Sequence, residues 1–227
     1  MKIQQVTGFE CAGVKGLVVV IDVLRAFTTA AFAFVAGAKE IILVGGIDEA
    51  FTLRESMPEA LLMGEDRGIF IPGFDYGNSP AALIGENLNG RSLIQRTTAG
   101  TQGVVNSINA DQIMCSSFVV ADATVRLIQS FNPEQVTFVN TGIRPETQGY
   151  GREDIACSDY ITALLHNETP NPEPYLQKVI ASREGISHAL NEDEKADIQC
   201  AIDLDRFDFA MLVHKENGRY ILKPITP

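Results

Sequence analysis

Apolar runs recur along the first part of the chain, and each is followed by a polar cluster and then by a segment with the apolar spacing of a helix. Near-continuous apolar strands that alternate with helices are typical of a largely parallel sheet covered on both faces. The pattern therefore predicts an α/β fold with three layers, α/β/α, around a largely parallel or mixed sheet. The expected strands lie at residues 16–21, 39–44, 60–63, 91–95, 112–114 and 136–139.

Two regions interrupt this alternation. Residues 66–80 carry several Gly and Pro residues, so we expect a long loop with several turns. Residues 167–175 contain three prolines and no apolar periodicity, which is typical of a linker. We therefore divide the chain into a main α/β domain, residues 1–166, and a C-terminal segment, residues 167–227.

The C-terminal segment has a pattern of its own. Its first part predicts helices, and its last part predicts an antiparallel pair of strands at residues 207–214 and 219–224. Glu216-Asn217-Gly218 is the expected turn between them, because Asn-Gly suits the tight turn of a β-hairpin. The segment either forms a smaller lobe or belongs to the same domain as the rest of the chain.

Polar clusters stand at the ends of the expected strands. In open parallel sheets, ligands bind outside the carboxyl ends of the strands. We therefore expect these clusters to lie at one edge of the sheet and to share a site. They are the residues around Asp22, Glu65, Arg96, Ser116 and Thr141.

Asp22 follows a run of apolar residues and precedes Val23 and Leu24. A carboxylate in such a setting is costly to bury unless it meets a cation, a metal or several donors. Arg25 is one candidate partner. Asp22 is then either a cap of the following helix, or a magnesium ligand or nucleophile of phosphoryl transfer.

The segment Arg96–Gly103 joins an expected strand to an expected helix through a turn rich in hydroxyl groups. Free backbone N–H groups, the helix dipole and Arg96 could together hold an anion there. The alternative is an ordinary helix cap made by Thr97 and Thr98. Ser116-Ser117 and Asn78-Ser79-Pro80 leave the same two alternatives open.

Two further acidic clusters, Glu65-Asp66-Arg67 and Arg152-Glu153-Asp154, place carboxylates beside an arginine in a loop. Either could provide hard oxygen ligands for magnesium, or be a solvated charge cluster. The acidic residues 192–194 read as an exposed face or a helix start.

Composition limits the partners, metal sites and cellular location that we expect. A net charge of −11 argues against nucleic acid as a partner, although a few arginines can still hold a small anion. The cysteines show no CxxC spacing and the histidines no HxxxH pair, so we expect reduced, buried thiols and no zinc site. With no long apolar run and no secretory leader, the prediction is a cytoplasmic protein without membrane contact. The oligomeric state stays open, with a homodimer as one alternative.

Five segments occur in this order along the chain: IDVLRAFTT, GFDYGNSP, RTTAGT, GREDIAC and DIQCAIDLDRFD. Together they resemble the 2-phosphosulfolactate phosphatase family, from about residue 17 to residue 210. The resemblance implies a magnesium-dependent phosphatase that converts (R)-2-phospho-3-sulfolactate into sulfolactate and phosphate, in a route to coenzyme M. By match to the family motifs, the site is expected to contain Asp22, Arg25, Thr28, Thr29, Asn78, Ser79, Arg96, Thr97, Thr98, Thr101, Arg152, Glu153 and Asp154.

The expected mechanism combines these readings. Arg25, Arg96 and Arg152 hold the phosphate and the other anionic groups of a small polyanionic substrate. Asp22, Glu65 and Asp154 hold Mg²⁺, and either Asp22 or water attacks phosphorus. The alternative is a non-catalytic protein that binds a phosphorylated or sulfonated acid. The expected carboxylates favour the enzyme over the binding protein. They would repel a bound phosphate unless a metal ion lies between them, and a protein that only binds the anion gains nothing from them.

Overall fold

The computed structural model describes residues 1–142, 151–190 and 194–227. Residues 192 and 193 of the acidic run thus lie outside the described residues. The strands are β1 (Lys2–Thr7), β2 (Leu17–Ile21), β3 (Glu40–Val44), β4 (Leu61–Asp66), β5 (Ile69–Phe70), β6 (Ser92–Arg96), β7 (Gln112–Ser116), β8 (Gln135–Asn140), β9 (Ala210–Glu216) and β10 (Arg219–Ile225). The α-helices are α1 (Ala26–Val35), α2 (Ile47–Ser56), α3 (Gly100–Asn106), α4 (Ala121–Phe131), α5 (Arg152–Leu165), α6 (Glu173–Ile180), α7 (Arg183–Leu190) and α8 (Lys195–Ala201). Short 3₁₀ turns are η1 (Cys11–Gly13), η2 (Ala81–Leu83) and η3 (Phe118–Val120).

The strands form one mixed sheet in the order β1-β8-β2-β7-β9-β10-β3-β6-β4-β5. It contains two parallel blocks, β1-β8-β2-β7 and β3-β6-β4. The antiparallel hairpin β9–β10 joins them, and it pairs antiparallel with β7 on one side and with β3 on the other. The expected α/β fold with a mixed sheet is confirmed.

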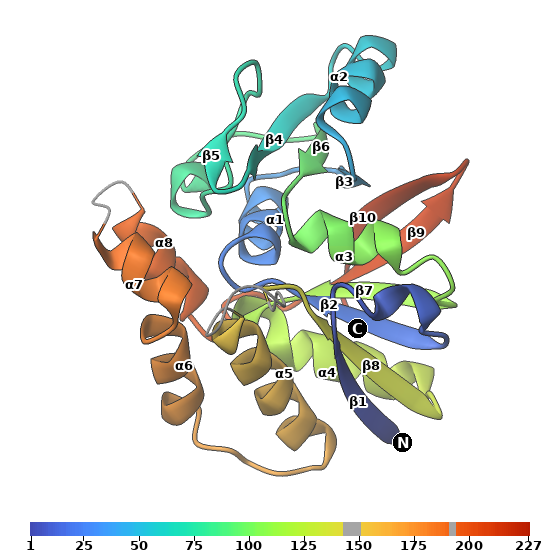
Figure 1. The fold of residues 1–227 in the computed structure, drawn as a ribbon, viewed down its shortest axis with the longest axis vertical. Helices are drawn as coiled ribbons and strands as arrows, with labels where there is room; N and C mark the ends of the chain where they lie inside the picture. Colours follow the sequence, from blue (N-terminus) through green and yellow to red (C-terminus); the bar gives the residue numbers. More distant parts are fainter. Residues whose placement is uncertain (143–150, 191–193) are drawn as a thin grey trace.

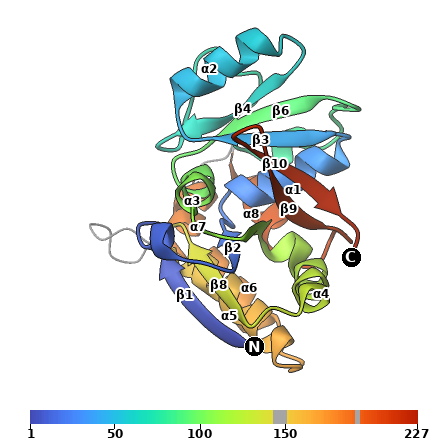
Figure 2. The ribbon, with the colours of Figure 1, turned by 90° about the vertical axis from the view of Figure 1, so that its right-hand side faces the viewer.

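The two blocks run in opposite directions along the sheet, because three antiparallel pairings separate β7 from β3. In a flat sheet their carboxyl ends would lie at opposite edges. The blocks instead lie one above the other, with α1 and α3 between them, in both views of the fold (Figures 1 and 2). Strong twist of the sheet brings the carboxyl end of β6 to the start of α1, where Gln95 donates a 3.0 Å hydrogen bond to the Ala26 carbonyl.

Helix α1 fills the space between the blocks, and nine of its ten residues are buried. It shares one apolar core with Val18 and Val20 of β2 and with Ile41 and Leu43 of β3. A helix that is apolar all round is stable only when it is buried in this way.

The outer faces of the blocks are covered separately. Leu17, Val19 and Ile21 of β2 point away from α1 and pack in a second core with α4 and α5. Ile42 and Val44 of β3 face a third core with α2. Both faces of the sheet are therefore covered, which explains why its strands read as continuous apolar runs.

The C-terminal segment enters the middle of the sheet. Strands β9 and β10 are joined at Asn217 and Gly218, whose φ angles of 51° and 77° are left-handed, so the expected hairpin and its turn are confirmed. The linker expected at residues 167–175 is wrong in its last three residues, because α6 already begins at Glu173. Proline is tolerated in the first turn of a helix. The domain division at residue 166 stays a prediction.

Two other expectations concern the chain as a whole. All four cysteines are free and buried, as expected. Within the described ranges, none of the helices is long and apolar enough to cross a membrane.

Candidate active site

Asp22 lies at the carboxyl end of β2, where β7 and β8 end on either side of it. Its side chain is 6% exposed. Its Oδ1 accepts a 2.9 Å hydrogen bond from the Ala26 N–H, so Asp22 does cap α1. Its Oδ2 lies 3.3 Å from the hydroxyl oxygen of Thr141, which follows β8. One carboxylate oxygen is therefore engaged by the helix, and the other faces the site.

Asp154 of α5 reaches the same point. It accepts hydrogen bonds from the N–H of Val23, at 2.9 Å, and from the N–H of Gly142, at 2.8 Å. Its Oδ2 lies 3.5 Å from the Thr141 hydroxyl, which thus stands between the two carboxylates. The structure brings together Asp22 and Asp154, two of the three expected metal ligands.

The charge on Asp22 is costly in this setting. Burial is the main cause that raises its pKa, to about 6, and the Glu65 carboxylate raises it further. The Ala26 N–H is the strongest opposing influence, and Arg25 is a weak one. Within the described part of the chain, Asp22 forms no ion pair. A cation at this point would stabilise the ionised carboxylate.

Glu65 occupies a different place from the one expected. It is 8% exposed, and its carboxylate accepts hydrogen bonds from the Thr98 N–H, the Thr98 hydroxyl and the Gly68 N–H, at 2.6, 2.9 and 2.6 Å. These bonds fasten the β4–β5 turn to the loop after β6. Glu65 is thus near enough to influence Asp22 electrostatically, but its oxygens are engaged by the loop.

Two glycines allow the close approach of these segments. A Cβ on Gly64, whose φ is +143°, would lie 1.8 Å from the carbonyl oxygen of Arg96. A Cβ on Gly100 would lie 2.7 Å from Oδ2 of Asp22. Glycine at these positions lets β4 pack on β6, and lets α3 begin directly beside the carboxylate.

Arg96 ends β6 and points along the end of β4. Its Nη1 donates to the Glu65 carbonyl oxygen and to Asp66 Oδ1, both at 2.7 Å. Its buried Nε has no hydrogen-bond partner among the described residues. Arg96 therefore brings a fixed positive charge, with one buried donor still unused.

The hydroxyls of Thr97 and Thr101 are engaged within the loop. Thr97 Oγ1 accepts from the Thr101 N–H at 3.0 Å, and Thr101 Oγ1 accepts from the Thr97 N–H at 2.9 Å. This is the capping alternative of the sequence reading. The N–H of Thr98 is bound to Glu65, so the backbone donors of this loop without a partner among the described residues are those of Ala99 and Gly100.

Arg25 does not pair with Asp22, which corrects that expectation. Its Nη1 lies 2.7 Å from Asp197 Oδ2, and its Nη2 lies 3.1 Å from Glu194 Oε1. Ser79 is close by, because its hydroxyl donates to Asp197 Oδ1 at 2.6 Å. Arg25 instead pairs with two carboxylates that are distant in sequence, Asp197 within α8 and Glu194 just before it.

The remaining expected site residues are scattered around this centre. Thr28 donates its hydroxyl to the Val23 carbonyl, at 2.8 Å. Thr29 Oγ1 and Asn78 Oδ1 are buried without hydrogen-bond partners in the described part of the chain. Arg152 is exposed at the first turn of α5, and its neighbour Glu153 is buried. The segment 143–150, which leads to Arg152, lies outside the described residues.

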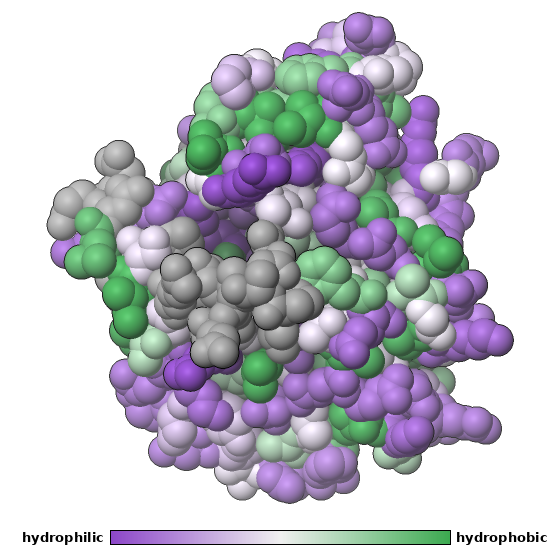
Figure 3. Space-filling model, in the orientation of Figure 1, coloured by the Kyte–Doolittle hydropathy of each residue, from purple (hydrophilic) through white to green (hydrophobic). Residues whose placement is uncertain are grey.

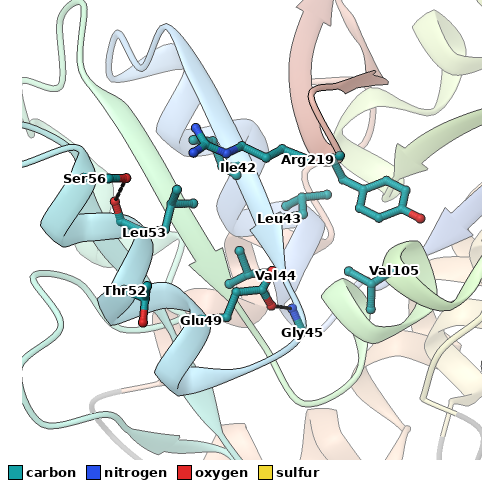
Figure 4. A pocket seen from close by; sticks show the side chains of 12 residues that line it. Ile42, Leu43, Val44, Gly45, Glu49, Thr52, Leu53, Ser56, Val105 and Arg219 are labelled. Atoms are coloured by element: carbon teal, nitrogen blue, oxygen red, sulfur yellow. Dashed lines mark hydrogen bonds between the residues drawn. The ribbon is translucent and has the colours of Figure 1, made fainter.

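Figure 3 shows a hollow on one face of the molecule, with strongly hydrophilic residues along its upper rim. A second depression is separate from it. This groove of about 510 Å³ lies between α2, β3 and the β9–β10 turn, with Ile42, Val44 and Leu53 along its apolar wall (Figure 4). None of the expected site residues lines it.

The donor set fits a magnesium ion in one respect and not in another. No three His, Cys, Asp or Glu side chains of the described residues are grouped as a ready-made metal site, so Asp22, Glu65 and Asp154 do not form a three-carboxylate cage. Magnesium, however, is usually held by one or two carboxylates, with water and substrate phosphate as the other ligands. The pair Asp22 and Asp154 meets that requirement.

Sequence reasoning missed two residues of this site. Thr141 was grouped with the polar strand ends but given no role. Asp197 was not singled out, because its polar neighbours Glu194 and Lys195 make α8 look like an exposed face, whereas Asp197 is fully buried. The resemblance of DIQCAIDLDRFD to the family tail, which begins at Asp197, was the one available signal.

Comparison with known proteins identifies the family. A family model described as 2-phosphosulpholactate phosphatase matches residues 5–216. A protein of Bacillus subtilis named probable 2-phosphosulfolactate phosphatase is 38% identical over 147 residues, which cover 65% of this chain and 63% of that relative. A protein with the same name from Carboxydothermus hydrogenoformans is 40% identical, over 65% of this chain and 60% of the relative. Another, from Clostridium perfringens (strain 13), is 33% identical, over 81% of this chain and 76% of the relative. The matched part thus spans less than two thirds of the first two relatives. The chain belongs to the 2-phosphosulpholactate phosphatase family.

Proposed function

We propose that this protein is a magnesium-dependent phosphatase that hydrolyses the phosphate monoester of a small polyanionic acid. Its relatives are named for 2-phosphosulfolactate, so (R)-2-phospho-3-sulfolactate is the first substrate to test. The observation that carries the proposal is the buried pair Asp22 and Asp154, which share the Thr141 hydroxyl at the strand ends. A role in a route to coenzyme M, and a cytoplasmic location, stay predictions.

Two carboxylates at one point need a positive partner if a phosphate is to approach them. Asp22 Oδ2 and Asp154 are the groups that would hold Mg²⁺. When bound, the ion would neutralise charge on the phosphoryl oxygens. The family resemblance and the uncompensated burial of Asp22 support this part of the proposal.

The chain's own residues have distinct tasks in this account. Arg96, with its unused buried Nε, and the N–H groups of Ala99 and Gly100 bind phosphoryl oxygens. Arg25 and the Asn78–Ser79 turn bind the acid's other anionic groups. The Thr141 hydroxyl, 3.0 Å from the Ile21 carbonyl oxygen and 3.3 Å from Oδ2 of Asp22, ties the end of β8 to the end of β2 beside the carboxylate. Because α3 begins beside Asp22, a phosphate held by its first N–H groups would lie close to Oδ2.

Asp22 can act in two ways, and both require its ionised form. In one, Oδ2 forms a bond to phosphorus, the substrate's ester oxygen leaves and takes up a proton, and water then cleaves the aspartyl phosphate. In the other, water attacks phosphorus while Asp22 accepts its proton, and the substrate's ester oxygen leaves and takes up a proton. Because Oδ1 is engaged by the Ala26 N–H, Oδ2 is the oxygen open to these roles as well as to Mg²⁺, so in either role the ion would be held mainly by Asp154.

The test is a phosphate-release assay over a set of phosphorylated hydroxy acids, with and without Mg²⁺. We expect turnover with 2-phosphosulfolactate or a related phosphorylated diacid that is lost on addition of EDTA and restored by Mg²⁺. Phosphorylated alcohols without a second anionic group should be poor substrates. Tight binding of these acids without phosphate release would support the alternative of a non-catalytic binding protein and would contradict the proposal.

A further inference from the structure

Asp197 of α8 is a buried carboxylate that joins two distant segments of the chain. It is 0% exposed. Its Oδ2 pairs with Arg25, which follows β2, and its Oδ1 accepts from the hydroxyl of Ser79, at 2.6 Å, and from the N–H of Ala81, at 3.0 Å. Both segments carry expected site residues, yet Asp197 itself lies in neither of them.

The Arg25 guanidinium is held from one side only. Its side chain is 8% exposed, and within the described residues it pairs with Asp197 at 2.7 Å and with the more exposed Glu194 at 3.1 Å. Arg25 stands three residues after Asp22 in the same loop, but within the described residues no hydrogen bond or ion pair joins them. Asp197 is thus the buried anion that directs the guanidinium toward α8.

Docking of α8 does not require such a pair. Ile198 and Ala201 on the same helix are buried and already provide apolar contact. A buried ion pair is often no more stabilising than well-packed apolar residues of the same size, and its better-attested use is to specify one arrangement. In this protein, the arrangement that it specifies is the direction of Arg25 and the position of the turn at Ser79.

We propose that Asp197 is a positioning residue that holds Arg25 and the Ser79 turn in place to bind the substrate's anionic groups, and that keeps Arg25 from pairing with Asp22. The inference rests on the proposed function, because Arg25 matters to turnover only if the site binds a phosphorylated acid. Without the Asp197 charge, the buried Arg25 would keep, among the described residues, only the more exposed Glu194 as a partner, which leaves its guanidinium freer to turn toward Asp22, three residues away in the same loop.

The effect should fall on substrate binding. In Asp197→Asn, the amide oxygen can stay on Ser79 and Ala81, and the NH₂ group then replaces the carboxylate oxygen that faced Arg25. We expect KM to rise at least ~10-fold, since charge-assisted arginine contacts to anions are among the strong ones. A purely structural loss would reduce the amount of active protein, and would therefore lower kcat while leaving KM unchanged.

The matched control is Asp203→Asn. Asp203 belongs to the same C-terminal segment and pairs with Arg206, but both side chains are 46% exposed. This substitution should leave KM, kcat and the melting temperature close to wild type. If Asp203→Asn raised KM as much as Asp197→Asn, the effect would come from charge on the segment as a whole, and the proposal would be wrong.

The closing experiment is a double-mutant cycle of Asp197→Asn and Arg25→Met, read in KM and in the Kd for inorganic phosphate. If Asp197 acts through Arg25, Asp197→Asn should cost less than ~3-fold in the Arg25→Met background. Equal losses in both backgrounds, or a fall in kcat at constant KM, would overturn the inference. If Asp197→Asn does not fold, Asp197→Glu, which keeps the charge but displaces it, carries the same cycle. An inactive wild type would refute the proposed function, and the phosphate-binding cycle would still decide the role of Asp197.

Discussion

The hydroxyl oxygen of Thr141 lies 3.3 Å from Oδ2 of Asp22, where β8 and β2 end side by side. The same oxygen lies 3.5 Å from Asp154. A hydroxyl group has one proton, so it can donate to only one of these carboxylates at a time. The nearest acceptor of the Thr141 hydroxyl is the Ile21 carbonyl oxygen, at 3.0 Å, so it does little to stabilise the buried charge of Asp22, which should be visible in the pH dependence of stability.

The first prediction concerns that pH dependence in the metal-free protein. Asp22 has a pKa of about 6 when folded, above the usual 3.8, so between these values the folded state binds more protons than the unfolded state. Its contribution is fully present below the lower value and is lost as pH rises through the upper one. The loss amounts to at most about 3 kcal/mol.

Comparison with Asp22→Asn isolates this contribution, because asparagine does not titrate and all other carboxylates are shared. Urea unfolding at several pH values should show the variant gaining stability relative to wild type as pH rises from about 4 to about 7. A difference in unfolding free energy that stays constant over this range would mean that the pKa of Asp22 is not raised.

The second prediction separates the metal ligands. Asp154→Asn should raise the Mg²⁺ concentration needed for half-maximal activity at least ~10-fold, because it removes one of two charged ligands. Glu65→Gln should change it by less than ~3-fold, since the Glu65 oxygens are already bound to Thr98 and Gly68. Isothermal titration with Mg²⁺ provides an independent reading. A larger effect in Glu65→Gln than in Asp154→Asn would reverse the assignment.

The third prediction concerns the contact between α3 and Asp22. In Gly100→Ala the new Cβ would lie 2.6 Å from the Cβ of Ala26 and 2.7 Å from Oδ2 of Asp22, so α3 must move away. We expect a loss of about 1–3 kcal/mol in stability and of at least ~10-fold in kcat/KM. Gly13→Ala is the control, because a Cβ there has nothing within 4 Å. If both variants behaved like wild type, the close contact between α3 and Asp22 would not contribute to activity.

The fourth prediction concerns Arg96. Arg96→Lys keeps the charge but removes the fork of donors and the buried Nε, so it should raise KM by roughly 10-fold. The comparison variant is Asp66→Asn, which removes the ion pair between Arg96 and the exposed Asp66 carboxylate. It should raise KM less than Arg96→Lys does. Steady-state kinetics of both variants test this. Unchanged KM and kcat in Arg96→Lys would remove Arg96 from the site.

The local pattern of the chain predicted six strands of the two parallel blocks and the C-terminal hairpin, but not β1 or β5. The strand before Asp22 was recognisable because both of its faces are buried, which makes it continuously apolar. The strands that lead to Arg96 and Thr141 are mostly apolar for the same reason, although each contains a buried polar residue, Gln95 and Thr137. The hairpin turn at Asn217 and Gly218 was recognisable because few residues accept its left-handed φ angles.

The pattern could not predict which distant segments meet. Nothing local in β9 and β10 indicates that they enter the sheet between β7 and β3 and so reverse half of it. The partner of Arg25 is Asp197, 172 residues away, whereas sequence proximity suggested Asp22. Long-range pairing of this kind depends on the packing of the whole chain, and not on the spacing of neighbouring residues.

The central claim is that Asp22 carries the chemistry, and one paired measurement tests it most directly. Phosphate release at saturating Mg²⁺ and thermal melting are measured on the same preparations of wild type and Asp22→Asn. The account predicts a fall of at least ~10²-fold in kcat, with a melting temperature near pH 7 that is unchanged or higher in metal-free buffer. A variant that melts far lower yet keeps its turnover would show that Asp22 serves only to cap α1, and would contradict the account.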